Sequence, residues 1–265
     1  MLAFAASPRV RARPHSLYRT LRAVDPVHKS PFGIWLLTRH ADVSSVLRSP
    51  VVSNTEANVD MDSLNLEGLN RIVSRLAFGQ HDMEAAREHK FFELMGSTML
   101  FRDPPDHTRL RALVNKAFTP KRAEALAPVV ESVLEEILGP IQPRSRMELM
   151  GELAYPLPAR IICELFGVPR EDQAFIVGLA PALAVGLDPG PMRSAESVRA
   201  AEKAAEELSS YLSALIEARR RQPGPDLLSA LVTAEENGEV LSQLELLSTT
   251  FLLLVAGHET TANLI

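Results

Sequence analysis

Cysteine is almost absent from this chain of 265 residues, in which Cys163 is the single one. One cysteine excludes an internal disulfide framework and is typical of a reducing compartment. The chain also lacks a large excess of charge of either sign, because its formal net charge is −5 at pH 7. Composition therefore indicates no general affinity for nucleic acid or anionic lipid, and we expect a cytoplasmic protein.

A membrane-spanning run is missing as well. A span needs about 18 or more apolar residues with few charges, but the most apolar stretch, Phe251–Val255, is soon followed by Gly257, His258 and Glu259. Met1–Ala6 is apolar but too short for a secretory signal, and no basic residue precedes it. With 46% hydrophobic and 23% charged residues, the composition is that of a globular protein with no membrane partner.

Helical patterns fill most of the chain. One clear strand signal occurs near the N-terminus, where Val27–Lys29 and Ile34–Thr38 flank a turn of Ser, Pro, Phe and Gly. Helical periodicity is visible over residues 14–23, 42–48, 128–138, 159–166, 194–221 and 226–236. Residues 51–100 are weakly patterned, and a segment of that kind is usually functional. The predicted fold class is mainly α with a small β-hairpin near the N-terminus.

The most informative helix is predicted to begin at Ser242, because Ser242 and Glu245 form a capping box. Apolar residues occupy all its sides until Ala256-Gly257-His258-Glu259-Thr260-Thr261. A helical Gly costs about 1 kcal/mol relative to Ala, and a buried carboxylate and hydroxyls need partners. A flat ligand against Ala256 and Gly257 explains this turn. The alternative is a buried helix with a Gly packing point and threonines bonded to the preceding turn.

A zinc-protease helix is excluded for the same stretch. His258-Glu259 begins like the zinc-binding motif, in which a second His follows four residues after the first. That position holds Ala262. No metal-ligand pair is therefore predicted on this helix.

A second informative stretch runs from Phe101 to Pro120. We expect Asp103 to cap a helix and Pro104 to take its first position. His107 and Arg111 are four residues apart, so they lie on one face and can donate hydrogen bonds to anionic oxygens. The alternative is a solvated basic face.

Both stretches resemble the cytochrome P-450 family of haem-thiolate monooxygenases, especially its soluble bacterial members. The matching residues are Asp103, Pro104, Pro105, His107 and Arg111 in one motif, and Ala256, Gly257, His258, Glu259 and Thr260 in the other. Tyr155–Pro158 and Ile161–Pro169 match the family's usual mid-chain helix. The resemblance implies that residues 1–265 form one incomplete domain, the N-terminal portion of that fold, which ends inside its central distal helix.

The resemblance also implies a function. The complete enzyme is expected to bind haem b, an iron cofactor, and to insert one oxygen atom of O₂ into an apolar small-molecule substrate. Electrons are expected from a ferredoxin- or flavin-type donor. His107 and Arg111 would bind the haem propionates, and Ala256 and Gly257 would leave room for the haem. Glu259 and Thr260 are the expected catalytic residues, which steer protons to dioxygen through water.

Further regions acquire expected roles from the same resemblance. Residues 51–100 and 183–191 would line and cover the substrate pocket. The basic residues Arg109, Lys116, Lys121 and Arg122 are candidates for docking the electron donor, with a solvated surface as the alternative. The proximal cysteine ligand of the haem is expected beyond the end of this chain, so no metal ligand is assigned within it.

Cys163 is not assigned that role, because it lies between Ile162 and Glu164 in an amphipathic helix and is expected to be a small buried hydrophobe. A rival hypothesis is a non-catalytic helical binding or scaffold protein derived from the same fold. A last expectation concerns Phe251–Val255, because five consecutive residues point all round a helix. We expect part of that apolar surface to stay exposed and the isolated chain to be poorly soluble or molten.

Overall fold

The structure is a computed structural model that describes residues 13–29, 35–53, 90–144, 146–187, 195–236 and 238–265. The chain divides into two compact units. The first comprises residues 1–83 and 189–193, and the second comprises residues 84–188 and 194–265. That residues 1–265 form one incomplete domain stays a prediction.

The first unit contains the predicted hairpin between two short helices. Its described elements are α3 (His15–Val24), β1 (Val27–Lys29), β2 (Trp35–Leu37) and α4 (His40–Leu47). The two strands are antiparallel, and Lys29 lies opposite Trp35 in the register. The Lys29 Nζ sits 5.3 Å from the centre of the Trp35 ring, a cation–π contact across the strand pair. The mainly helical fold class with a small N-terminal hairpin is confirmed.

The second unit is built from helices. Its helices are α7 (Lys90–Gly96), α8 (Asp106–Ala117), α9 (Pro120–Glu124), α10 (Ala127–Leu138), α11 (Pro156–Leu165), α12 (Arg170–Leu187), α13 (Ala195–Arg221), α14 (Leu227–Thr233) and α15 (Gln243–Ala262). A 3-10 turn (Met99–Phe101), a π-helical turn (Met150–Ala154) and two strands, β3 (Glu235–Glu236) and β4 (Glu239–Val240), complete it. The small β3–β4 hairpin was not predicted, because its two-residue strands are too short to show an alternating pattern.

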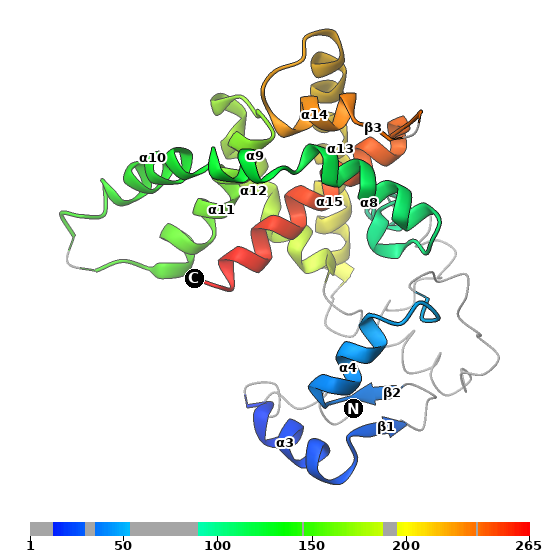
Figure 1. Ribbon diagram of the computed structural model, residues 1–265. Helices are drawn as coiled ribbons and strands as arrows, with labels where there is room; N and C mark the ends of the chain where they lie inside the picture. The colour runs from blue at the N-terminus through cyan, green and yellow to red at the C-terminus, as the bar shows by residue number, and fades with distance from the viewer. Residues whose placement is uncertain (1–12, 30–34, 54–89, 145, 188–194, 237) are drawn as a thin grey trace. The chain divides into compact units, whose positions relative to one another are not determined.

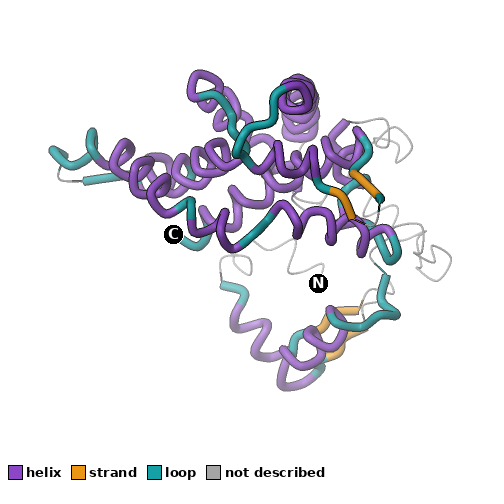
Figure 2. The backbone as a smooth tube through the Cα atoms, turned by 45° about the horizontal axis from the view of Figure 1, so that its top comes forward, coloured by secondary structure: helices purple, strands orange, loops and turns teal. Residues whose placement is uncertain are grey.

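Helix α15 runs through the middle of this unit (Figure 1), in contact with α7, α11, α12, α13 and α14. It begins as predicted, because the Ser242 hydroxyl accepts from the Glu245 amide and the Glu245 carboxylate accepts from the Ser242 amide at 2.8 Å. Figure 2 shows the same helices from a second direction. The expectation that part of the Phe251–Val255 surface stays exposed holds only for Leu253. The other four residues are buried, because α15 packs against helices from several parts of the chain.

Aromatic packing joins α7 to α15. The Phe91 and Phe251 rings meet edge to face, with centroids 5.9 Å apart. A Cβ on Gly186 of α12 would come within 2.7 Å of the Phe91 ring, so the ring rests against that glycine. The amides of Lys90 and Phe91 both donate to the Glu202 carboxylate on α13, which thereby occupies the N-terminus of α7.

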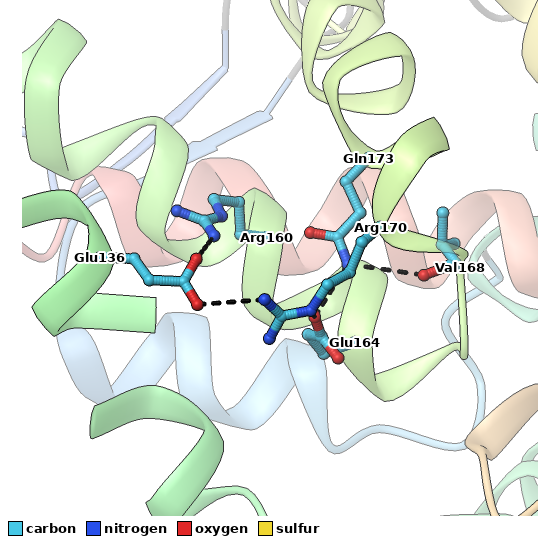
Figure 3. Close-up of polar contacts among 6 residues, drawn as sticks. All are labelled: Glu136, Arg160, Glu164, Val168, Arg170 and Gln173. Carbon is cyan, nitrogen blue, oxygen red and sulfur yellow. Dashed lines mark hydrogen bonds and ion pairs between the residues drawn. The ribbon is translucent and has the colours of Figure 1, made fainter. Parts of the chain in front are cut away.

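Ion pairs connect α10, α11 and α12 on the outside of the unit (Figure 3). The Glu136 carboxylate accepts from Arg160 and, at 3.2 Å, from Arg170. The Arg160 hydrogen bond, followed by that of Arg170, holds the pKa of Glu136 below its usual value despite an opposing effect of desolvation. Gln173 donates to Glu164 at 2.9 Å and so fixes the turn between α11 and α12.

The turn between α11 and α12 is a helix end with a left-handed residue. Gly167 has φ +68°, the left-handed conformation expected of the residue after a helix. Its amide donates to Glu164, and the Val168 amide donates to the Cys163 carbonyl at 2.9 Å. These two bonds are those of a Schellman motif, which ends α11 and reverses the chain into α12.

Helix α8 begins later than predicted. Its first residue is Asp106 and its N-cap residue is Pro105, so neither Asp103 as cap nor Pro104 as first helical residue is correct. The physical reason is that Pro105 disfavours the helical conformation for the residue before it. The buried face of α8 is an apolar stripe made of Leu110, Leu113, Val114 and Ala117.

Candidate functional site

The turn from Ala256 to Thr261 lies where α15 changes from fully packed to exposed on one side. Ala256 and Thr260, four residues apart on one face, are both exposed. The Thr260 hydroxyl donates to the Ala256 carbonyl at 2.8 Å, and the Thr261 hydroxyl donates to the Gly257 carbonyl at 3.0 Å. The expectation that these hydroxyls are buried is wrong. Their own helix satisfies them, as the alternative interpretation held.

The carboxylate in this turn has one neighbour that the sequence analysis missed. Glu259 is half-buried, and the Asn263 side-chain amide donates to the Glu259 carbonyl at 2.9 Å and to its carboxylate at 3.3 Å. An amide four residues after a carboxylate on a helix is a pairing that spacing alone can indicate. Asn263 therefore restrains the Glu259 side chain along the helix and leaves Oε1 available to water.

His258 faces the opposite side of α15 from Thr260 and Ala256. Its side chain is buried, and its Nε2 lies 3.1 Å from the Tyr155 carbonyl oxygen at the start of α11. The two rings also stack, with centroids 5.6 Å apart and planes 21° apart. His258 lines a small apolar cavity with residues of α11, α12 and α13, among them Ile162, Ile176, Leu183 and Leu208.

Gly257 is a packing point between α15 and α11. A Cβ at this position would come within 2.6 Å of the Ile162 Cδ1 atom. Small size at residue 257 is therefore explained by a neighbouring helix, as the alternative interpretation proposed. Ala256, which is exposed, remains the residue of this pair that could lie against a bound ligand.

The basic residues of α8 divide into two groups. His107 is half-buried and Arg111 is exposed, and the part of the chain that the structure describes offers neither side chain a hydrogen bond or an ion pair. Arg109 instead pairs with Glu245 and, at 3.4 Å, with Glu239. The hydrogen bond to Glu245 raises the pKa of Arg109. His107 and Arg111, which are four residues apart, thus remain as two donors on one face of α8.

The four candidates for docking an electron donor are mostly engaged within the chain. Besides the pairs of Arg109, Lys116 donates to the Glu235 carbonyl at 2.8 Å and Arg122 donates to the Ala117 carbonyl at 2.7 Å. Lys121 shows no such bond among the described residues. These contacts favour a structural role for three of the four residues.

Cys163 behaves as predicted. It is fully buried in α11, and burial, with a smaller effect from Glu164, raises the pKa of its thiol to about 12. Within the described ranges, no group of three or more His, Cys, Asp or Glu side chains is arranged to hold a metal ion. No helix in those ranges is long and apolar enough to cross a membrane.

The segments expected to line a substrate pocket are only partly visible. Residues 54–89 and 188–194 lie outside the described residues. Of the described part, Phe91 and Leu94 pack into the core, and Leu183 borders the small cavity beside His258. A pocket-lining role for residues 51–100 and 183–191 stays a prediction.

Sequence comparison gives consistent relatives. The chain is 37% identical over 257 residues to cytochrome P450 107B1 of Saccharopolyspora erythraea, covering 97% of this chain and 56% of that protein. It is 38% identical over 261 residues to the cytochrome P450 monooxygenase PikC of Streptomyces venezuelae, covering 96% and 55%. No family model matches the chain.

Solved structures agree. The fold matches that of P450BioI, solved with a fatty acid carried on an acyl carrier protein, with a TM-score of 0.80 at 28% identity. That match covers 98% of this chain and 61% of the other. The cytochrome P450 PksS of Bacillus subtilis matches with a TM-score of 0.78 at 32% identity, covering 98% and 59%. The chain belongs to the cytochrome P450 family, is similar to bacterial members of it, and corresponds to the N-terminal portion of its fold. It spans less than two thirds of the length of these relatives.

Proposed function

We propose that the protein to which this chain belongs is a haem-dependent monooxygenase that inserts one oxygen atom of O₂ into an apolar small molecule. The main support is the two-sided character of α15 at Ala256–Thr260. One side is packed against α11 through Gly257 and His258, and the other presents Ala256 and Thr260 free of protein cover among the described residues. A helix with this asymmetry is suited to a flat ligand.

The residues fit a haem group. His107 and Arg111 place two donors without described partners on one face of α8, which suits two propionates. Ala256 is a small exposed residue against which a flat ring can lie. When bound, the haem supplies the binding and reductive activation of O₂. Its proximal ligand is not Cys163, which is buried in α11 and kept as a neutral thiol.

Glu259 and Thr260 have complementary parts in proton delivery. The Thr260 hydroxyl donates a hydrogen bond to the Ala256 carbonyl, so its oxygen can accept a hydrogen bond from water. The Glu259 carboxylate, restrained by Asn263, can take a proton from solvent and pass it to such a water. Together they would hold a water molecule through Thr260 and supply it with a proton through Glu259.

The proposed partners follow from the family. They are an apolar substrate, O₂ and a ferredoxin- or flavin-type electron donor. One similar structure contains myristic acid, and it is 34% identical to this chain with a TM-score of 0.77. We therefore choose myristic acid as the first substrate probe.

The test is to produce the full-length protein, add haem, reduce it, and bind carbon monoxide. The proposal expects one haem per chain and the red-shifted absorbance of a thiolate–haem complex. With myristic acid, O₂ and an electron donor, a product containing one atom of labelled O₂ is expected. A folded protein that binds no haem would favour the rival, a non-catalytic scaffold derived from the fold.

A further inference from the structure

Two consecutive residues of α15 are held by one face of the α11 region. Gly257 packs against Ile162, whose Cδ1 would lie only 2.6 Å from a Cβ at residue 257. His258 reaches Tyr155 through a hydrogen bond and a ring stack. Tyr155 and Ile162 are seven residues apart, so they lie about two turns apart on the same side of α11. These two contacts hold the last turns of α15 against the α11 region.

The hydrogen bond has a defined direction. A backbone carbonyl oxygen can only accept, so the Nε2 of His258 must carry the proton that it donates to Tyr155. The partner is main chain at the N-cap of α11, which cannot swing away as a side chain can. The His258 ring is therefore fixed in both tautomer and orientation.

The His258–Tyr155 contact lies at the point where α15 changes from buried to partly exposed. Residues 246–252, 254 and 255 are buried, whereas Ala256, Thr260 and Thr261 are exposed. The hydroxyls of both threonines bond within α15 and tie the turn to nothing outside it. Gly257 and His258 both contact the α11 region, and Ala262 one turn later is buried.

We propose that His258 is a positioning residue that sets the direction of Glu259 and Thr260 by anchoring their helical turn to the Tyr155 carbonyl. The effect on catalysis rests on the proposed function, whereas the anchoring of the turn by His258 does not depend on it. Because Glu259 and Thr260 follow His258 directly, a rotation of this turn redirects the carboxylate and the hydroxyl together. An ordinary core histidine would contribute stability without that effect.

Three variants of the full-length haem protein separate these cases. His258→Phe keeps a ring against Tyr155 and removes the donor. His258→Gln keeps an N–H donor. Thr250→Val is the matched control, because it removes a buried hydroxyl from α15 that bonds only to the Leu246 carbonyl of its own helix.

The first measurement is amide hydrogen exchange of residues 257–263, with residues 243–252 as the internal reference. We expect His258→Phe to speed exchange of 257–263 about tenfold, as loss of one buried hydrogen bond implies. His258→Gln should restore much of the protection, and Thr250→Val should leave this segment unchanged. If residues 257–263 of His258→Phe exchange at the wild-type rate, His258 does not anchor this turn. If His258→Phe does not fold, nitrogen NMR of the wild-type ring decides, because an Nδ1–H tautomer excludes the bond.

The second measurement is the fraction of consumed reductant recovered as hydrogen peroxide, with myristic acid as substrate and at equal haem content. We expect a larger peroxide fraction in His258→Phe than in the wild type. The fraction in His258→Gln and in Thr250→Val should stay near the wild-type value. If His258→Phe shows faster exchange but an unchanged peroxide fraction, His258 has a structural role only, and the positioning role is rejected. A wild-type protein that binds no haem or oxidises nothing would count against the proposed function, while exchange and tautomer would still decide the anchor.

Discussion

The guanidinium of Arg109 on α8 donates to the carboxylate of Glu245, which also accepts the backbone amide of Ser242 at the start of α15. One carboxylate thus closes the capping box of α15 and joins that helix to the one that carries His107 and Arg111. Both side chains are about three-quarters buried, because their exposed fractions are 26% and 22%. The two helices that bear the candidate site are therefore linked by a protected ion pair.

This pair predicts a stability effect that depends on pH. Arg109→Met should lower the free energy of unfolding by about 1 kcal/mol at pH 7. Desolvation opposes ionisation of Glu245, but the hydrogen bonds from Arg109 and Ser242 outweigh it and lower the pKa of this carboxyl. The contribution of Glu245 is therefore complete above its usual value of 4.5 and is lost as pH falls through the lowered folded pKa.

Urea unfolding at pH 7 and at successively lower pH checks this. The difference between wild type and Arg109→Met should shrink in acid. The control is Lys203→Met, which breaks an ion pair in which Lys203 is 78% exposed and which should therefore matter little. An equal effect of both variants at pH 7, or a difference that grows in acid, would contradict the account.

A second prediction concerns haem retention. His107→Ala and Arg111→Ala should each weaken haem binding in the full-length protein, and the double variant should lose most of its haem. Each charged hydrogen bond contributes about 1.5–3 kcal/mol. Haem content is measured by absorbance after gel filtration, with Lys121→Ala as a control for removal of a nearby positive charge. Full haem content in the double variant would exclude these residues as propionate ligands.

The packing at Gly257 gives a third prediction. Gly257→Ala gains about 1 kcal/mol of helix propensity but places a methyl group against Ile162. Overpacking costs about 1–3 kcal/mol, so a net loss of stability is expected in the wild-type background. In an Ile162→Val background, which removes Cδ1, the same substitution should be neutral or stabilising. Equal effects in both backgrounds, measured by thermal unfolding, would show that the two residues do not interact.

Cys163 allows a fourth prediction. Burial raises the pKa of this thiol to about 12, so very little thiolate is present at pH 8. Iodoacetamide should leave Cys163 unmodified in the folded protein and label it fully in urea, as peptide mass spectrometry can show. Labelling of the native protein at the rate of a free cysteine would show that α11 opens readily or that the thiol is not buried.

Much of this architecture follows from local signals in the sequence. The Ser242–Glu245 capping box is found as predicted, and it depends only on neighbours in the chain, as do the Gly167 helix end and the stripe from Leu110 to Ala117. The start of α8 was misplaced because adjacent prolines compete with a good capping sequence. Sequence spacing also correctly placed His107 and Arg111 on one face.

The remainder depends on contacts between residues far apart in the chain. The sequence cannot show that Ile162 fills the space beside Gly257, that His258 reaches the Tyr155 carbonyl, or that Arg109 pairs with Glu245. Burial of Phe251–Val255 was missed for the same reason, because the covering helices come from several parts of the chain. Asn263 beside Glu259 was within reach of spacing rules and was overlooked.

We propose that the exposed face of α15 takes part in oxygen chemistry, and two adjacent threonines allow this face to be compared with its neighbour. Thr260 and Thr261 are both exposed, and each hydroxyl donates to the carbonyl four residues before it. They differ by about 100° around the helix, so only Thr260 shares the face of Ala256. Thr260→Val and Thr261→Val therefore remove equivalent hydroxyls that lie on two different faces of α15.

The measurement is product formed per reductant consumed by the haem-loaded, full-length protein with myristic acid. Thr260→Val should keep consuming reductant while its product yield falls several-fold and peroxide rises. Thr261→Val should match the wild type. A Thr260→Val variant with the wild-type ratio, or an equal loss in both variants, would contradict the assignment of this face of α15.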